Sequence, residues 1–261
     1  MFIKNLKLFN FKNHSEKSFD FSPEINCFVG NNGAGKTNIL DALHYLSMAK
    51  SFLGNLDAQN ILHESDFFAI EAEIQGEEKN DIIKVQLPKE GKKIIKKNDK
   101  TYERIADHIG FLPSVMISPY DSNLISDGSE SRRKFLDAMI SQTDSDYLFA
   151  LIQYQKTLQQ RNALLKYFAK NRTFDLDSLE IYNEPLNKFG TQIFEKRQRF
   201  VASILPTIQH FYEIISKGNE KVTVIYESNL NEQNFEEILS ENLEKDRVLT
   251  YTSRGINKND L

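Results

Sequence analysis

Apolar and polar residues alternate along short runs in the first half of the chain, which is the pattern of half-buried β-strands. β-Branched residues fill the runs near the middle of this half, and Pro88 and Gly91 between two of them favour antiparallel hairpins. The run Ile-Asn-Cys-Phe-Val at 25–29 is mostly apolar and predicts a short buried strand. In all, we predict strands at 2–8, 16–21, 25–29, 67–74, 82–87, 92–96 and 112–119.

Apolar residues recur at helical spacing elsewhere. The spacing predicts helices over 36–50 and over 129–142. Two longer apolar stripes, 151–168 and 182–204, are separated by a polar stretch, so they predict an antiparallel, coiled-coil-like helical pair. Near the end we predict a strand at 222–226 and a short helix at 234–243.

A glycine-rich loop lies between the predicted strand 25–29 and the predicted helix 36–50. Its sequence, Gly-Asn-Asn-Gly-Ala-Gly-Lys-Thr at 30–37, fits the phosphate-loop pattern G-x-x-x-x-G-K-[ST]. Glycines let the backbone approach a phosphate closely, and the helix N-terminus adds a positive partial charge. The alternative is a glycine-rich turn that binds nothing, and the flanking strand and helix argue against it.

The phosphate-loop pattern predicts a role for individual residues of the loop. Lys36 is predicted to reach the β- and γ-phosphates, and the Thr37 hydroxyl is predicted to hold Mg²⁺. The predicted nucleotide-binding residues are Gly30, Asn31, Asn32, Gly33, Ala34, Gly35, Lys36, Thr37 and Asn38.

Composition narrows the class of protein. The chain has 261 residues, of which 40% are hydrophobic and 27% charged, values typical of a soluble globular protein with one large or two small domains. The single cysteine, Cys27, excludes an internal disulfide and is predicted to be a core thiol. The histidines lack zinc-ligand spacing, and neither a signal peptide nor a membrane-spanning run is evident, so we expect a cytoplasmic protein without membrane contact.

The formal net charge is −4, so any nucleic-acid contact has to come from local basic patches. Residues 84–104 carry eight basic and three acidic side chains. They fit either a basic edge that touches a nucleic-acid backbone or a solvated hairpin whose lysines discourage edge pairing. Arg132, Arg133 and Lys134 stand in the first turn of a predicted helix, where cations are disfavoured by the helix dipole. This placement indicates an anionic partner or carboxylates brought in by folding.

Five stretches of the chain together resemble the RecF family of bacterial recombination-repair ATPases, which is related to chromosome-maintenance ATPases and ABC transporter ATPases. The arginine-pair block and the Gln-Arg-Asn block are the most specific, and the resemblance covers nearly the whole chain. The stretches are Leu6–Asn13, Gly30–Thr37, Ile117–Asp121, Gly128–Asp137 and Tyr154–Lys166.

The resemblance implies an α/β fold: a P-loop ABC-type ATPase head with mixed sheets and an inserted helical, coiled-coil-like arm. With the pattern above, it implies three parts. Residues 1–118 form a nucleotide-binding lobe with the phosphate loop and antiparallel hairpins. Residues 119–217 form the helical arm, and residues 218–261 return to the ATPase lobe.

The resemblance also implies partners and further site residues. It implies ATP and Mg²⁺ as cofactors, an ATP-dependent homodimer, binding to gapped, single- and double-stranded DNA, and co-operation with a RecR-type mediator in loading the recombinase RecA. Lys12 and Asn13 would line the nucleotide pocket, and Asp121 would sit in a metal- or water-sensing loop. Arg132, Arg133 and Lys134 are candidate contacts to DNA or a partner.

The chain departs from the family pattern in three ways. Leu53 stands near where the family usually carries an arginine. No apolar strand ends in paired carboxylates, Val222–Glu227 being the nearest candidate, and no Ser-x-Gly-type signature loop is present. The last seven residues, 255–261, resemble a stretch that precedes both elements in the family. We therefore expect a chain that is the first two-thirds of a RecF protein, without an identified catalytic residue and with little or no ATP hydrolysis.

Three functions fit the sequence. They are a DNA-repair ATPase, a nucleotide-binding interaction module without turnover, and a small-molecule kinase or GTPase. The segment Asn257-Lys258-Asn259-Asp260 superficially matches a guanine-specificity motif, but no strand precedes it. Selectivity for ATP over GTP separates the third function from the others, and ATP-stimulated binding to gapped DNA separates the first from the second.

Overall fold

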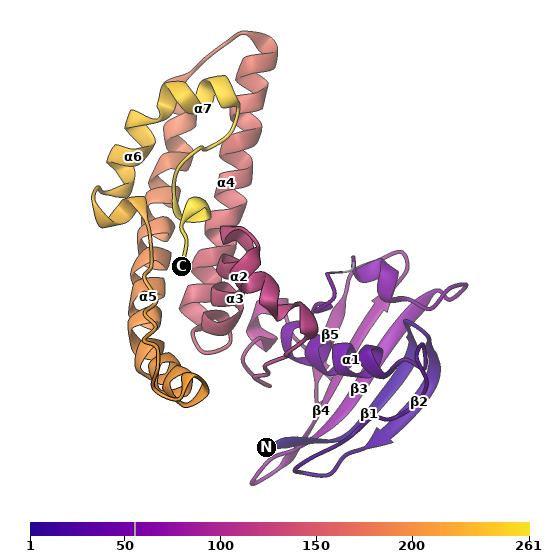
Figure 1. Ribbon diagram of the computed structural model, residues 1–261. Helices are drawn as coiled ribbons and strands as arrows, with labels where there is room; N and C mark the ends of the chain where they lie inside the picture. The colour runs from indigo at the N-terminus through magenta and orange to yellow at the C-terminus, as the bar shows by residue number, and fades with distance from the viewer. Residues whose placement is uncertain (55) are drawn as a thin grey trace. The chain divides into compact units, whose positions relative to one another are not determined.

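The computed structural model describes residues 1–54 and 56–261. This part of the chain divides into two compact units, Met1–Ser118 and Pro119–Leu261 (Figure 1). Residues 218–261, which we expected to return to the first lobe, belong to the second unit. The reason is their apolar side chains: Tyr226, Phe235, Leu239 and Ile256 are buried in the core of the helical unit.

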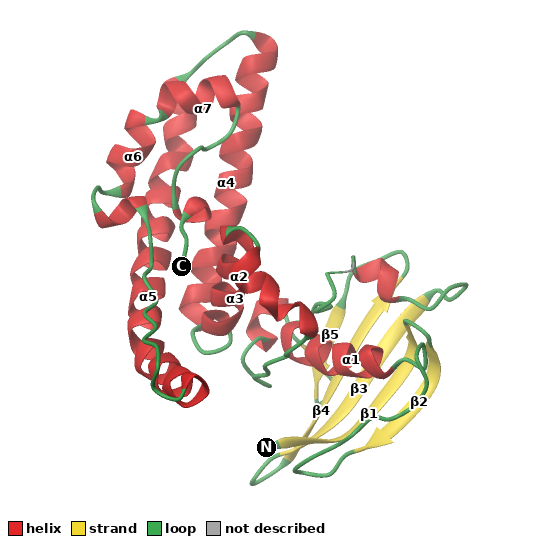
Figure 2. Cartoon of the chain, in the orientation of Figure 1, coloured by secondary structure: helices red, strands yellow, loops and turns green. Residues whose placement is uncertain are grey.

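The first unit is built on a six-stranded sheet in the order β2-β1-β3-β4-β5-β6, in which every pairing is antiparallel (Figure 2). Helix α1 (Lys36–Met48) follows the phosphate loop, and two short 3₁₀ helices, η1 (Asp57–Asn60) and η2 (Ile105–His108), lie in the connections. The strands are β1 (Phe2–Phe11), β2 (His14–Asp20), β3 (Phe67–Gln75), β4 (Asn80–Pro88), β5 (Ile94–Lys97) and β6 (Lys100–Thr101).

Alternation along the strands divides the sheet into a buried and a solvated face. On β3 the side chains of Phe68, Ile70, Ala72 and Ile74 are buried in one core together with apolar residues of α1. On the other face, Glu71 lies between two lysines of neighbouring strands: its carboxylate oxygens are 3.4 Å from Lys7 Nζ and 3.4 Å from Lys84 Nζ. One face of the sheet therefore carries charged pairs, while the other packs against α1.

Two predicted strands of this unit, 25–29 and 112–119, are absent from the sheet. Ile25 and Val29 are 83% and 90% exposed, and Cys27 is exposed and not a core thiol. Only Phe28 of the first run packs, edge-to-face, on Phe19 and Phe21. An apolar run becomes a strand only where another strand accepts its backbone hydrogen bonds, and within the described residues none pairs with either run.

The second unit is helical. Its elements are η3 (Pro119–Ser122), α2 (Asn123–Ser126), α3 (Ser129–Ser141), α4 (Ser145–Asn171), α5 (Leu176–Ser216), η4 (Asn229–Asn231), α6 (Phe235–Glu241), α7 (Leu243–Leu249) and η5 (Ile256–Lys258). Helices α4 and α5 form the predicted antiparallel pair, and α6 and α7 lie beside it (Figure 1). Among the described helices, none contains a stretch that is both long enough and apolar enough to cross a membrane.

Two buried arginines tie the end of the chain to the helical pair. Arg197 on α5 donates to the Asp137 carboxylate (2.7 Å) and to the backbone oxygen of Ile256 (3.0 Å). Arg161 on α4 donates to Asp246 Oδ2 and to Thr252 Oγ1, each at 2.7 Å. These contacts span long distances in sequence, so they hold residues 246–256 against helices that come much earlier.

The predicted strand 222–226 is also absent from the structure. Residue Glu227, just after it, exchanges two backbone hydrogen bonds with Asp260, at 2.9 and 3.0 Å, which makes an isolated bridge. Tyr226 is buried because Arg197 and Asn259 both hydrogen-bond to its hydroxyl. A two-residue bridge replaces the strand that the β-branched pattern predicted.

His108 makes the first unit sensitive to acid. Its ring is fully buried, and Nε2 lies 2.6 Å from the backbone oxygen of Leu46 on α1, so Nε2 carries the proton. Burial lowers the pKa of His108 from 6.5. Nδ1 is buried without an acceptor among the described residues, so a second proton there would be unsatisfied.

The unfolded chain therefore binds a proton at His108 at a higher pH than the folded chain does. This contribution to stability is complete above about pH 6.5 and is lost as the pH falls below it. We expect urea unfolding to show a larger loss of stability from about pH 7.5 to about pH 5.5 in the wild type than in His108→Gln, whose amide still donates to Leu46. Equal losses would contradict this account of the histidine.

Candidate nucleotide-binding site

The phosphate loop has the backbone conformation that its glycines permit. Gly33 and Gly35 have φ values of 82° and 94°, in the left-handed region that side chains disfavour. Gly35 is constrained a second time: a Cβ atom at this position would lie 2.6 Å from Asn13 Oδ1 and from the ring of His14. Both glycines are therefore required by the local geometry.

The Lys36 side chain folds back over its own loop. Its Nζ donates to the backbone oxygens of Gly30 (2.8 Å) and Asn31 (2.9 Å). The ammonium group is thereby placed at the loop instead of trailing into solvent. This is the position from which it can meet an anion held by the loop.

The backbone amides at the start of α1 are available to donate hydrogen bonds to a ligand. Gly35 is the N-cap, and the first bond of the helix runs from the Ile39 amide to the Gly35 oxygen at 3.1 Å. Among the described residues, no acceptor takes the amide protons of residues 35–38. Four free N–H groups and the positive end of a 13-residue helix make this loop a candidate anion-binding site.

The oxygen ligand that Thr37 offers also fits a hydrated Mg²⁺ held beside a phosphate. Thr37 is exposed in the first turn of α1, which is where its hydroxyl can serve as a ligand. Within the described residues, no group of three or more histidine, cysteine, aspartate or glutamate side chains could hold a metal. Because Mg²⁺ commonly keeps several waters and takes few protein ligands, one hydroxyl suits a metal carried mainly by phosphate oxygens.

Lys12 and Asn13 were predicted to line the nucleotide pocket, and the structure gives each side chain partners within the protein. The Lys12 ammonium is buried 2.5 Å from Asp41 Oδ2, in a pair whose side chains are 8% and 0% exposed. Asp41 also accepts from the Ser51 hydroxyl and the Phe52 amide. Lys12 thus fastens the segment after β1 to α1, and Asp41 fastens α1 to the loop that follows the helix. Asn13 bonds to the phosphate loop itself, as described further below.

Other predicted residues lie on the second unit. Asp121 is in η3 and its role at a nucleotide stays a prediction. Arg132 forms a bidentate pair with the Asp260 carboxylate at 2.6 and 2.9 Å, and its hydrogen bond holds the pKa of Asp260 below the usual range. Arg133 donates to the backbone oxygen of Asn259. Folding therefore brings a carboxylate and a carbonyl to this basic turn.

Lys134 remains at the surface, where it pairs with Glu130 at 2.7 Å. Four of the eight basic side chains in the run 84–104 are paired in a similar way. Lys84, Lys93, Lys97 and Arg104 pair with Asp99, Asp57, Asp81 and Asp107 respectively. These pairings favour the interpretation of the run as a solvated hairpin.

Leu53, near the position where the family usually carries an arginine, is partly exposed and brings no charge.

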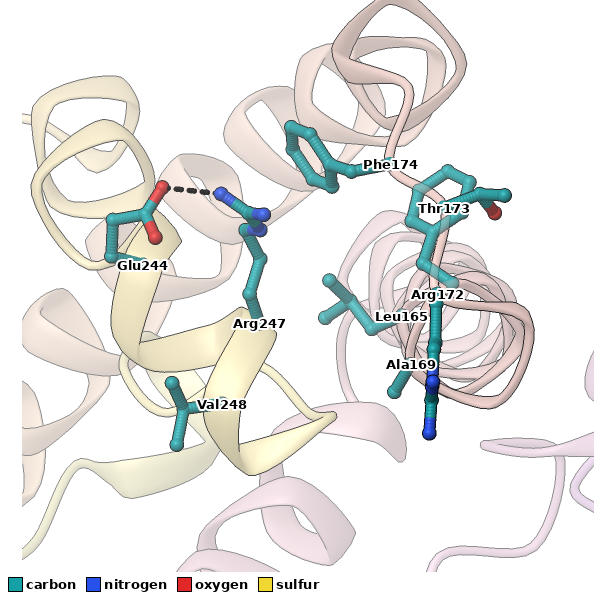
Figure 3. Close-up of a pocket in the computed structure, with 9 residues that line it drawn as sticks. Leu165, Ala169, Arg172, Thr173, Phe174, Glu244, Arg247 and Val248 are labelled. Atoms are coloured by element: carbon teal, nitrogen blue, oxygen red, sulfur yellow. Dashed lines mark hydrogen bonds and ion pairs between the residues drawn. The ribbon is translucent and has the colours of Figure 1, made fainter.

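The helical unit has a separate hollow of about 400 Å³ near the loop that joins α4 to α5 (Figure 3). Arg247 of α7 crosses it, paired with Glu244 at 2.6 Å and stacked 4.0 Å from the centre of the Phe174 ring. Its cation is already satisfied by these two neighbours. The hollow therefore has no free charge at Arg247 with which to recognise a phosphate.

Comparisons with known proteins place these features in a family. Residues 2–226 match the family model described as the RecF/RecN/SMC N terminal domain. The chain is 52% identical over 261 residues to the DNA replication and repair protein RecF of Flavobacterium johnsoniae, with all of this chain and 73% of that protein covered. It is 44% identical over 264 residues to the RecF protein of Phocaeicola vulgatus, with all of this chain and 70% of that protein covered.

The same likeness holds in three dimensions. The structure of a recombination mediator protein RecF with ATP matches with a TM-score of 0.93 and 30% sequence identity, over 99% of this chain and 72% of that chain. A second RecF structure, with ATPγS, matches equally well. This likeness confirms the predicted α/β fold class with a helical arm.

Proposed function

Because the chain belongs to the RecF family, we propose that it binds ATP at residues 30–38 and acts in recombinational DNA repair. The observation that carries the proposal is the loop geometry. Lys36 Nζ lies 2.8 Å from the oxygen of Gly30, beside the free amides of residues 35–38. Backbone amides and one ammonium on a helix N-terminus are the groups that bind a triphosphate. The RecF structure with ATP, which matches over 99% of this chain, supports ATP as the nucleotide.

Each group has a distinct part in the proposal. The amides of residues 35–37 hold the β-phosphate, and Lys36 neutralises charge on the β- and γ-phosphates. The Thr37 hydroxyl would hold Mg²⁺, which when bound neutralises further charge on the phosphate oxygens. Asp121 is retained as a candidate pocket residue on family resemblance.

The proposed partners follow from family membership. They are gapped, single- and double-stranded DNA, a RecR-type mediator and a second copy of the chain in an ATP-dependent homodimer, with the cytoplasm as the place of action. Arg132 is not proposed as a free DNA contact, because Asp260 already occupies its guanidinium. DNA contact is therefore expected from surfaces other than this pair.

The proposal is tested by two titrations. We expect MgATP to bind the chain more tightly than MgGTP, measured by isothermal titration calorimetry. We also expect the fluorescence anisotropy of a labelled gapped duplex to rise at lower protein concentration when ATP is present. Equal affinity for ATP and GTP would favour a different class of nucleotide-binding protein, and DNA binding unchanged by ATP would argue against the repair function.

A nucleotide-binding module without turnover is the second candidate. Within the described residues no group of three or more histidine, cysteine, aspartate or glutamate side chains could hold a metal, and the segment 222–227, the nearest candidate for a carboxylate-bearing strand, does not form a strand. We therefore expect phosphate release from ATP by this chain to be no faster than that by Lys36→Ala. Turnover clearly above that variant would show that a catalytic carboxylate has been overlooked.

A further inference from the structure

The corner between β1 and β2 lies next to the phosphate loop and contacts it. Strand β1 ends at Phe11 and β2 begins at His14, so the corner consists of two residues, Lys12 and Asn13. The Lys12 amide donates to the Asn60 oxygen at 2.8 Å, and its ammonium is buried against Asp41 of α1. The corner is thus fixed to the helix that the phosphate loop opens.

From this corner two side chains reach the loop backbone. Asn13 Nδ2 donates to the Gly33 oxygen at 3.2 Å, while its Oδ1 accepts from Asn38 Nδ2 at 2.8 Å. His14 Nε2 lies 3.2 Å from the Gly35 oxygen, and this residue is 5% exposed. A carbonyl oxygen only accepts, so Nε2 is the donor and carries the ring proton.

These contacts go to carbonyl oxygens of the loop and leave its N–H groups for an anion. A phosphate-binding loop uses its N–H groups for the anion, so its carbonyls need other donors. Lys36 supplies donors to Gly30 and Asn31. The corner supplies a donor to Gly33 and a second donor to Gly35, whose oxygen also accepts from the Ile39 amide. Together the two sets satisfy four carbonyls of the loop before any anion arrives.

The fit of the corner to the loop is close. The Cα of Gly35 faces both side chains so directly that a Cβ would lie 2.6 Å from Asn13 Oδ1 and from His14 Nε2. The glycine of the motif and the residues of the corner are therefore matched to each other. His14 was not predicted from the sequence, although it directly follows the Lys12-Asn13 pair.

We propose that Asn13 and His14 are positioning residues that hold the phosphate loop in its anion-receiving conformation without touching the nucleotide. The proposal rests on the ATP-binding function above. It predicts that nucleotide affinity depends on two donors aimed at loop carbonyls. This role acts through the loop backbone and differs from the pocket-lining role that the family resemblance implied for Asn13.

The test removes each donor while keeping the shape of the side chain. His14→Leu and Asn13→Leu are neutral changes that take away the donors to Gly35 and Gly33. We expect each to raise the Kd for MgATP roughly three- to tenfold, the size that one lost neutral hydrogen bond gives. His14→Gln, whose amide can donate to the Gly35 oxygen, should restore affinity to near the wild-type value. Amide hydrogen exchange at residues 33–37 without nucleotide should be faster in His14→Leu than in His14→Gln.

Asn5→Leu is the matched control, because Asn5 makes side-chain hydrogen bonds to Ser18 and Asp20 on the same hairpin, away from the loop. It should leave the Kd unchanged. If the wild type binds MgATP and both leucine variants bind it equally well, the positioning role is wrong while ATP binding stands. A His14→Gln variant that binds MgATP as weakly as His14→Leu does would also overturn the positioning role. If the wild type itself fails to bind, the proposed function fails first.

Discussion

Lys36→Ala is expected to weaken MgATP binding about 10- to 100-fold, because it removes the only ammonium that the structure places at the phosphate loop within the described residues. A charge-assisted hydrogen bond contributes about 1.5–3 kcal/mol, and about 1.4 kcal/mol changes a binding constant tenfold. The variant also leaves the oxygens of Gly30 and Asn31 without this donor. The change should appear in the Kd measured by calorimetry at constant ionic strength.

Lys50→Ala is the control for this prediction, since Lys50 is an exposed lysine just beyond the other end of α1. It removes the same charge and should leave the Kd within about twofold of the wild type. A Lys36→Ala variant that binds MgATP as tightly as Lys50→Ala would mean that the nucleotide is held elsewhere.

Arg161→Met is expected to cost about 3–5 kcal/mol of unfolding free energy, because it leaves the buried Asp246 carboxylate without its counter-charge. Arg161 and Asp246 are 0% and 1% exposed, so water cannot replace the lost partner. The guanidinium also donates to Thr252 and Asn183, and both contacts would go with it. The loss is measured as a shift of the urea midpoint, followed by circular dichroism at 222 nm, where the helical unit dominates.

Arg199→Ala is the comparison, since Arg199 on α5 makes an exposed pair with Glu195 one helical turn away. Exposed pairs of this kind contribute little, so its midpoint should stay close to that of the wild type. Similar shifts for the two variants would show that the buried pair is not what holds residues 246–252 to α4.

The parts of the fold that depend on local pattern could be predicted from the sequence. The alternation at 67–74 and the apolar spacing after Lys36 gave β3 and α1 close to their observed bounds. The stripes at 151–168 and 182–204 gave the α4–α5 pair for the same reason. In each case the residues that determine the element lie within it.

The parts that depend on distant partners could not be predicted. The run 25–29 has the composition of a strand, but a strand needs a neighbour to accept its hydrogen bonds, and local pattern does not specify one. The basic turn at Arg132 predicted an anionic partner or a carboxylate brought in by folding, but local pattern could not identify Asp260, which is 128 residues away. His14 was missed because its role depends on the position of the Gly35 oxygen, which only the fold supplies.

The central claim is that the amides of the phosphate loop grip the triphosphate of ATP. Amide nitrogen–proton correlation spectra of the labelled chain, recorded during titration with MgATP, test it most directly. The account predicts that the largest shifts fall on residues 33–38 and saturate with the calorimetric Kd. Saturable shifts confined to the helical unit, with residues 33–38 unchanged, would contradict it.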